Sequence, residues 1–160
     1  GGIVGYGGSA GGLLLGAVVN KSPELFLGMI IQVGFLDSLT TNLDHSLPLT
    51  LGELTEFGDA KNNKKHFEYI KSYSPYHNIK KMSYPHLLLV TNIKDVRVLF
   101  DEPLKFTAKL RQYKTDNNLL LFKCELEDAG HGGKSGRDSA IEEIAFDYSF
   151  ILKITKQLNS

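Results

Sequence analysis

The sequence predicts an α/β protein in which about four parallel strands form a sheet with flanking helices on both faces. Four short apolar segments alternate with segments of helical periodicity along the 160 residues. A glycine-rich turn, residues 7–11, joins the first apolar segment to the first helical one. Strands separated by helices run parallel and are joined by right-handed crossovers. A chain of this length suits one domain with a sizeable core.

The first third of the chain contains two of the predicted strands and the helix between them. Ile3 and Val4 form the apolar part of the first strand, which ends at the glycine-rich turn. Residues 10–20 predict a helix that is apolar nearly all round and therefore buried on more than one side. Within residues 26–35, the nearly continuous apolar run 29–33 is typical of a parallel strand covered on both faces.

The middle third starts with a polar and irregular segment. Residues 37–65 are expected to pass over the sheet with short helical turns. Residues 64–72 predict a brief helix that ends before Pro75. Residues 86–91 have an apolar centre and predict the third buried strand.

The last third predicts two helices and one strand. Asp101 is expected to cap the first helix, with Pro103 in its first turn. Its apolar face comprises Phe106, Leu110 and Tyr113. Residues 119–126 predict the fourth strand. A final helical stripe of about five turns comprises Ile141, Ile144, Ala145, Tyr148, Leu152 and Thr155.

Composition argues against several classes of partner. Lys plus Arg total 18 and Asp plus Glu total 18, so the sequence shows no electrostatic footprint for nucleic acid or an anionic membrane. No apolar run reaches transmembrane length. The single cysteine, Cys124, is expected to be reduced and buried, which fits a cytoplasmic protein. Five scattered histidines and one cysteine do not have the spacing of a zinc site, so no metal is expected.

The glycine-rich turn has the pattern Gly-x-Ser-x-Gly at a strand–helix junction. This pattern predicts a nucleophile elbow, in which Ser9 lies on a turn too tight for side chains on either flank. Glycine at Gly7 and Gly11 would let strand and helix approach closely and leave the Ser9 hydroxyl exposed above the sheet. The backbone N–H of Ala10, at the helix start, would face an oxyanion formed beside Ser9.

Two other interpretations of the turn remain open at this point. The residues also match a dinucleotide-binding turn, Gly5-x-Gly7-x-x-Ala10. That motif needs an acidic residue near the end of the next strand, whereas Glu24 stands before that strand begins. A P-loop is excluded because no Gly-Lys-Ser/Thr follows the turn. The second interpretation is a glycine-rich turn without chemistry.

Three of the predicted strands are followed by residues that suit a catalytic triad. Ser9 follows the first strand, Asp95 the third and His131 the fourth. The carboxyl ends of parallel strands meet at one edge of a sheet, so these side chains are expected to converge. The order Ser, Asp, His is that of the α/β hydrolases. His131 would accept the Ser9 proton, and Asp95 would fix the tautomer of the imidazole.

Other residues compete for the roles of acid and base. Asp37 is a rival acid because it follows the second strand, where some α/β hydrolases place theirs. Asp128 stands too close to His131 along the chain to support it well. We prefer Asp95 for its place after the third strand. His131 alone has glycines before and after it; the other histidines are His45, His66, His77 and His86.

Four stretches of the sequence carry a family resemblance. They are residues 7–12 (GGSAGG), 48–53 (PLTLGE), 71–76 (KSYSPY) and 129–137 (AGHGGKSGR). Together they resemble the prolyl oligopeptidase family, and the resemblance covers essentially the whole chain. It implies a cytoplasmic serine peptidase without a cofactor that cuts short peptides after Arg or Lys. Ser9, Asp95 and His131 are implied as its triad.

The resemblance also implies substrate-binding residues. In family members that prefer basic residues, the preference depends on acidic groups in the loop that resembles residues 49–57. Glu53 stands at the first acidic position, whereas Thr55 occupies the second, with Glu56 next to it. Losing one of two carboxylates would weaken selectivity for Arg. Arg97 resembles a substrate-contacting arginine of the family.

The family also has segments that this sequence lacks. These are an N-terminal β-propeller and early strands that carry a tyrosine, the second oxyanion donor. The start at Gly1 is interpreted as the C-terminal half of an α/β-hydrolase fold whose N-terminal part is missing. Loss of one donor costs about 10²–10³ in rate. The alternative function is therefore an inactive truncated remnant, or a half that needs the missing part as a partner. Its sheet should end abruptly at residues 3–4, and the isolated chain should aggregate or be only marginally folded.

Overall fold

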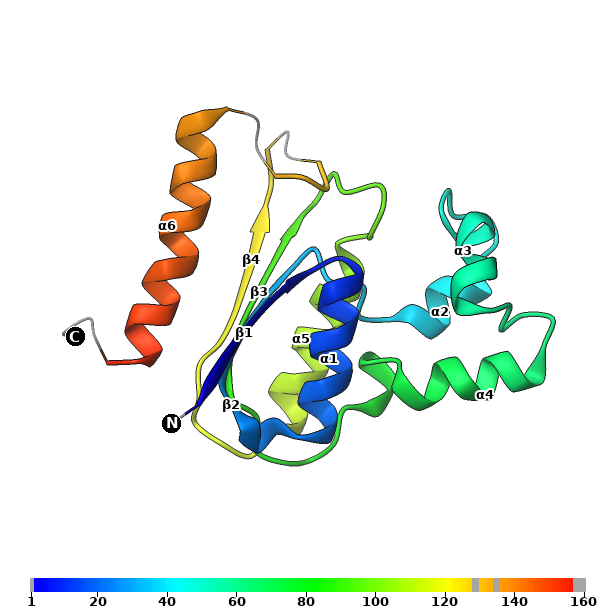
Figure 1. The fold of residues 1–160 in the computed structure, drawn as a ribbon, viewed down its shortest axis with the longest axis horizontal. Helices are drawn as coiled ribbons and strands as arrows, with labels where there is room; N and C mark the ends of the chain where they lie inside the picture. Colours follow the sequence, from blue (N-terminus) through cyan, green and yellow to red (C-terminus); the bar gives the residue numbers. More distant parts are fainter. Residues whose placement is uncertain (1, 128–129, 134–135, 157–160) are drawn as a thin grey trace.

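The computed structural model describes residues 2–127, 130–133 and 136–156. Gly1 and Asp128 lie outside the described residues, as do three residues of the stretch 129–137. In the described residues, one sheet lies between a single long helix on one face and a layer of helices on the other (Figure 1). The predicted α/β class is therefore confirmed.

The sheet has four parallel strands in the order β1-β2-β3-β4. Each strand therefore pairs with the strand that precedes or follows it in sequence, and β1 is an edge strand, as predicted. Parallel pairing brings the carboxyl ends of all the strands to one edge of the sheet. The strands are β1 (Ile3–Gly8), β2 (Phe26–Gln32), β3 (His86–Asn92) and β4 (Leu120–Glu125).

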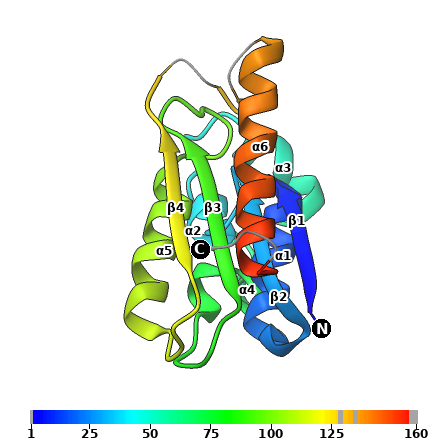
Figure 2. The same ribbon diagram turned by 90° about the vertical axis from the view of Figure 1, so that its left-hand side faces the viewer.

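Helices cover both faces of the sheet because the central strands are apolar on both sides. Met29 and Ile31 of β2 pack in the cluster that includes residues of α1 (Ala10–Lys21) and α5 (Asp101–Tyr113). Ile30, between them, packs with α6 (Arg137–Ile154) on the opposite face. In Figure 2, α6 crosses in front of the sheet. The alternation explains the continuous apolar run, since successive side chains point to opposite faces.

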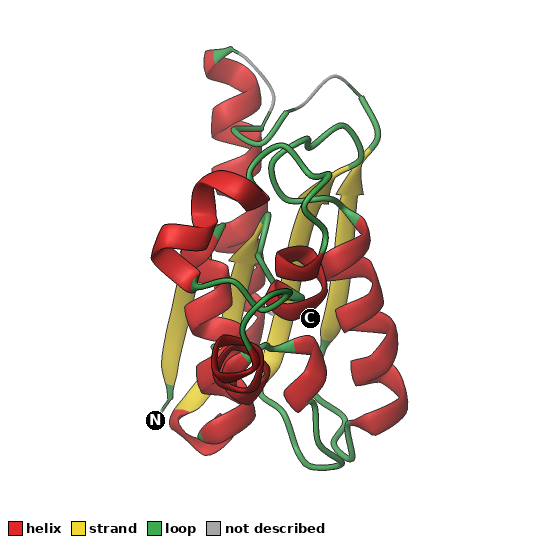
Figure 3. Cartoon of the chain, turned by 90° about the vertical axis from the view of Figure 1, so that its right-hand side faces the viewer, coloured by secondary structure: helices red, strands yellow, loops and turns green. Residues whose placement is uncertain are grey.

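The segment between β2 and β3 adds short helices beyond the α1–α5 layer. This arrangement agrees with the predicted excursion, and the short helices lie in front of the sheet in Figure 3. The helix α4 ends at Tyr73, just before Ser74 and Pro75, as expected. The segment contains α2 (Ser38–Leu43), α3 (Thr50–Phe57), α4 (Lys64–Tyr73) and the 3₁₀ turn η2 (Tyr76–Asn78); a further 3₁₀ turn, η1 (Pro23–Leu25), precedes β2.

Two helices bury fewer or different residues than the sequence indicated. The apolar stripe of α6 faces outward in part, because Ile144 is 54% exposed. The buried face of α6 instead contains Asp147, Phe150 and Ile154. Because the polar residue Asp147 lies on that face, its apolar residues do not form a regular pattern in the sequence. In α1, Leu13 and Val19 pack in two different clusters, so the helix is buried on more than one side as expected, although Leu14 is 63% exposed.

Two local expectations were also wrong. Asp101 does not cap α5: Phe100 is the N-cap residue and makes no side-chain cap, and Asp101 is the first helical residue. Its carboxylate instead lies 3.8 Å from Lys105 Nζ. Cys124 is free but only half-buried, because β4 is an edge strand of the sheet. No helix in the described part of the chain is long and apolar enough to span a membrane.

Candidate active site

Ser9 lies on the turn between β1 and α1 in a strained backbone conformation. Its φ is 52° and its ψ is −119°, a left-handed value that few non-glycine residues adopt. Backbone hydrogen bonds fix it on two sides. Ser9 N–H donates to the Gln32 carbonyl at 3.0 Å, and the Ser9 carbonyl accepts from Phe35 N–H at 3.1 Å. The end of β2 and the connection that follows it therefore hold the strained turn in place.

Glycine permits the close approach of strand and helix at this turn. A Cβ on Gly7 would lie 2.8 Å from the Gly11 carbonyl oxygen, and one on Gly12 would lie 2.6 Å from Gly34 Cα. At Gly11 itself a Cβ would meet nothing within 4 Å. The expectation that both outer glycines of the motif are needed is thus correct for Gly7, and Gly12 replaces Gly11 as the second close approach.

The expected oxyanion donor, the Ala10 N–H, lies at the start of α1 next to Ser9. Ala10 is exposed and is the first residue of α1. Within the described residues, the N–H groups that bond to the Ser9 carbonyl from this helix belong to Gly12, at 2.9 Å, and Leu13, at 3.2 Å. The earlier N–H of Ala10 belongs to the set that a helix leaves without an intrahelical partner, at its positive end.

His131 and Asp95 contact each other at the carboxyl edge of the sheet. His131 Nδ1 lies 2.7 Å from Asp95 Oδ2. A carboxylate only accepts here, so Nδ1 carries the hydrogen and Nε2 is left to accept a proton. Asp95 is 2% exposed, and its Oδ1 accepts from the N–H groups of Arg97 at 2.8 Å and Val98 at 3.0 Å. Asn92 Nδ2 donates to the Gly130 carbonyl at 2.6 Å and holds the histidine loop.

Ser9 and His131 line the same cavity, whose volume is about 230 Å³. Among the described residues they share this cavity without a hydrogen bond between them. Catalytic hydrogen bonds are often long before substrate binds. The same cavity is also lined by Ala10, Glu53, Glu56, Arg97 and Glu102, among others. The residues predicted from sequence are therefore gathered at one site, whereas Thr55 does not line it.

Two carboxylates give one wall of the cavity its acidic character. Glu53 and Glu56 both lie on α3 and line the cavity. Burial raises the pKa of Glu53, and the charge of Glu56 raises it further. A cationic group between the two carboxylates would favour their ionised forms and so oppose this rise in the pKa of Glu53. From sequence, Glu56 was expected only as the neighbour of Thr55. In the helix α3, residues three apart share one face, which brings Glu53 and Glu56 together.

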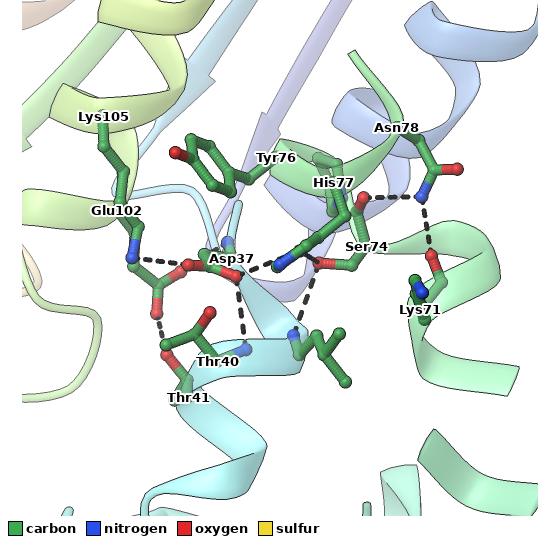
Figure 4. Close-up of polar contacts among 12 residues, drawn as sticks. Asp37, Thr40, Thr41, Lys71, Ser74, Tyr76, His77, Asn78, Glu102 and Lys105 are labelled. Atoms are coloured by element: carbon green, nitrogen blue, oxygen red, sulfur yellow. Dashed lines mark hydrogen bonds and ion pairs between the residues drawn. The ribbon is translucent and has the colours of Figure 1, made fainter. Parts of the chain in front are cut away.

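Asp37 is not the partner of His131. It is fully buried at the start of α2, where its Oδ1 accepts from Thr40 N–H at 3.2 Å (Figure 4). Its Oδ2 pairs with Lys105 Nζ at 2.5 Å, and its Oδ1 lies 3.4 Å from His77 Nδ1. These contacts give Asp37 a place in a buried ionic cluster away from the histidine loop.

The remaining alternatives from the sequence lie elsewhere. Glu24 belongs to η1, which precedes β2, and so lies at the opposite end of the parallel pair from Ser9. The dinucleotide-binding interpretation therefore lacks its acidic residue. Among the described residues, no group of His, Cys, Asp and Glu side chains has a metal-binding arrangement.

Asp147 was missed from the sequence and supports the strands beside Ser9. Its Oδ2 accepts from Tyr6 Oη at 3.0 Å and from Gln32 Nε2 at 2.8 Å. Burial raises the pKa of this carboxyl, and the two hydrogen bonds lower it. Gln32 is the residue whose carbonyl accepts from Ser9 N–H, so Asp147 connects α6 to the turn at Ser9.

Comparison with known proteins gives the chain a context. The model of the prolyl oligopeptidase family matches residues 2–158. The protein named Protease 2 from Moraxella lacunata is 51% identical over 146 residues, which cover 91% of this chain and 21% of that protein.

Two solved structures are similar over nearly all of the chain. Oligopeptidase B from Leishmania major has a TM-score of 0.92 and 40% identity, covering 96% of this chain and 21% of that one. Oligopeptidase B from Trypanosoma brucei, in a closed form with covalently bound antipain, has a TM-score of 0.90 and 45% identity, covering 94% and 21%. The chain thus spans about a fifth of the length of these relatives.

Proposed function

The chain belongs to the prolyl oligopeptidase family, and from this membership and the site we propose that it carries the catalytic triad of a serine peptidase. Ser9, Asp95 and His131 are its nucleophile, acid and base. The observation that carries the proposal is the 2.7 Å contact of Asp95 with His131, beside a cavity that the strained Ser9 also lines. Antipain is covalently bound in the Trypanosoma brucei relative, which supports a nucleophile in a protein of this family.

The reaction follows from what each group can do. Ser9 Oγ attacks the scissile carbonyl carbon while His131 Nε2 takes its proton. The Ala10 N–H donates to the oxyanion, and Asp95 stabilises the imidazolium. The C–N bond then breaks, the amine leaves with the proton from His131, and Ser9 remains acylated. Water, deprotonated by His131, then attacks the acyl carbon. The bond from this carbon to Ser9 Oγ breaks, His131 returns the proton to Ser9 Oγ, and the peptide leaves with a new carboxyl group.

We propose short peptides with Arg or Lys at the cleaved bond as substrates. Glu53 and Glu56 on the acidic wall would bind the cationic side chain, since a carboxylate forms a charge-assisted pair with a guanidinium. Arg97 is exposed at the same cavity and would contact the peptide. Glu56 supplies the second carboxylate that Thr55 does not, so we expect the preference for basic residues to survive.

A fluorophosphonate probe tests the nucleophile. In the full-length protein the probe should label Ser9, and Ser9→Ala should abolish the labelling. His131→Ala should slow it by orders of magnitude while leaving Ser9 present. Equal labelling of the Ser9→Ala variant would refute the assignment.

A second candidate concerns the 160-residue chain by itself. Its nucleophile strand is an edge, and Tyr6 beside the site is 61% exposed, so the chain alone would be an inactive remnant or a half that requires a partner. The test is an assay of the isolated chain on a Lys or Arg ester. Turnover that His131→Ala abolishes would refute this candidate. We also propose a cytoplasmic location, which the free Cys124 supports.

A further inference from the structure

Glu102 is a buried carboxylate at the cavity that the proposed mechanism does not use. It lies in the first turn of α5, is 3% exposed and lines the same cavity as Ser9 and His131. Its Oε2 accepts from Asp37 N–H at 2.9 Å, and its Oε1 accepts a short hydrogen bond from Thr41 Oγ1 (Figure 4). Burying a carboxylate is costly unless it has such partners, so its presence here calls for a role.

The two hydrogen bonds join α5 to α2 and to its N-cap residue, Asp37. On one side, Thr41 belongs to α2, and its carbonyl accepts from Thr50 Oγ1 at 3.1 Å. Thr50 is the first residue of α3, the helix that carries the acidic wall with Glu53. A chain of hydrogen bonds therefore runs from Glu102 through Thr41 and Thr50 to the helix of the acidic wall.

On the other side, Glu102 is continuous with the segment that carries the proposed acid. The turn between β3 and α5 contains Asp95 and Arg97, and Glu102 N–H donates to the Leu99 carbonyl at 3.1 Å at its end. The Glu102–Thr41 contact joins residues 61 positions apart in sequence and so connects the end of this turn to α2.

We propose that Glu102 is a positioning residue that holds the acidic α3 wall at the right distance from the catalytic groups, and so sets substrate affinity. This inference rests on the proposed peptidase function. Glu102 does not touch the reacting atoms in the mechanism above. Its loss should therefore weaken binding of the basic side chain more than it slows chemistry, which is a change in KM with kcat nearly kept.

Charged and titratable side chains from α2, η2 and α5 surround Glu102. Asp37, at the start of α2, and Lys105, on α5, form an ion pair at 2.5 Å. His77 of η2 contacts Asp37 at 3.4 Å, and Asp101 contacts Lys105 at 3.8 Å. Burial raises the pKa of Glu102 to about 7, although the bonds from Thr41 and Asp37 N–H oppose the rise. An ionised Glu102 adds a negative charge to the cavity, so KM for a cationic substrate should fall as pH rises through neutrality.

Thr41 offers the mildest test, because its hydroxyl can be removed without changing the shape of the side chain. In the full-length protein, Thr41→Val should raise KM for Arg and Lys esters about tenfold, the effect of losing one hydrogen bond to a charged group, with kcat nearly kept. Thr41→Ser restores the hydroxyl and should restore KM. Glu102→Leu should raise KM similarly, and the double variant should add little more, since both changes break one contact.

Thr107 provides the matched control. It is 1% exposed on the same helix as Glu102, and its Oγ1 donates to the Pro103 carbonyl at 2.7 Å. Thr107→Val removes a buried hydroxyl of α5 without touching the Glu102–Thr41 contact and should leave KM unchanged. If Thr41→Val changes KM no more than Thr107→Val does, the proposal is wrong.

Labelling by the fluorophosphonate probe separates this proposal from the proposed function. All these variants should label Ser9 at the wild-type rate, because the triad is intact. A wild-type protein that is not labelled overturns the peptidase proposal and this one with it. A labelled wild type whose KM is insensitive to Thr41→Val and Glu102→Leu overturns the role of Glu102 alone.

Discussion

Replacing Glu102 with glutamine should make the protein more stable than the wild type above neutral pH. In acid, the two proteins should have nearly the same stability. Burial raises the pKa of Glu102 from 4.5 to about 7. Between these values the unfolded chain releases a proton that the folded chain keeps, so the free energy of unfolding falls as pH rises. At about 1.36 kcal/mol per unit of pKa shift, the ionised Glu102 lowers the free energy of unfolding by about 3 kcal/mol above pH 7. Glu102→Gln removes this cost.

The glutamine amide can replace both hydrogen bonds of the protonated carboxyl. Its oxygen can accept from Asp37 N–H, and its NH₂ can donate to Thr41 Oγ1, which accepts as well as donates. The difference between variant and wild type should therefore be small in acid and grow with pH. For a folding unit of this size, about 3 kcal/mol corresponds to roughly 6–12 °C in Tm.

The assay is thermal unfolding of the full-length wild type and variant between about pH 4 and pH 9, followed by circular dichroism. Glu68→Gln, on an exposed position of α4, controls for the removal of one negative charge. A Tm difference that stays constant across this range would refute the reasoning. It would mean that Thr41 and the Asp37 N–H stabilise the carboxylate as much as burial destabilises it.

Three further predictions follow from the site and the sheet. Asp95→Asn should lower kcat by about 10⁴, because the wrong tautomer of His131 then faces Ser9, whereas Asp37→Asn should lower stability with a far smaller loss of kcat; the reverse ranking would reassign the acid. Glu53→Gln should raise KM for Arg and Lys esters about tenfold and leave a neutral ester unchanged; equal effects on both esters would remove Glu53 from substrate binding. The isolated 160-residue chain should aggregate through the open edge of β1, and a monodisperse monomer with cooperative unfolding would contradict this.

The strands could be predicted from sequence because burial on both faces leaves a mark that needs no knowledge of the fold. Met29, Ile30 and Ile31 are each almost completely buried, although they point alternately to two helical layers. The face of α6 that packs on the sheet could not be predicted in the same way. Asp147 interrupts it, while Ile144 on the outer side completes a regular apolar stripe.

Turn chemistry was predictable in kind and less so in detail. The motif around Ser9 correctly indicated a tight strand–helix junction, because a close backbone approach demands glycine at Gly7 and Gly12, while the positive φ falls on Ser9 itself. Which glycine meets its neighbour depends on Gly34, a residue of the next strand–helix connection. Asp101 is a residue type that often caps helices, but α5 begins one residue earlier than expected, with Phe100 at the N-cap.

The contacts between distant side chains differ in whether topology alone brings them together. Asp95 and His131 are 36 positions apart, and their meeting follows from parallel strands whose carboxyl ends share one edge. Glu102 and Thr41 are 61 positions apart and belong to segments outside the sheet, whose relative placement no strand order dictates. Only the packed structure shows that a buried carboxylate there has partners on both of its oxygens. The most informative variants of this chain are therefore at Thr41 and Glu102, where the sequence carries the least warning of a role.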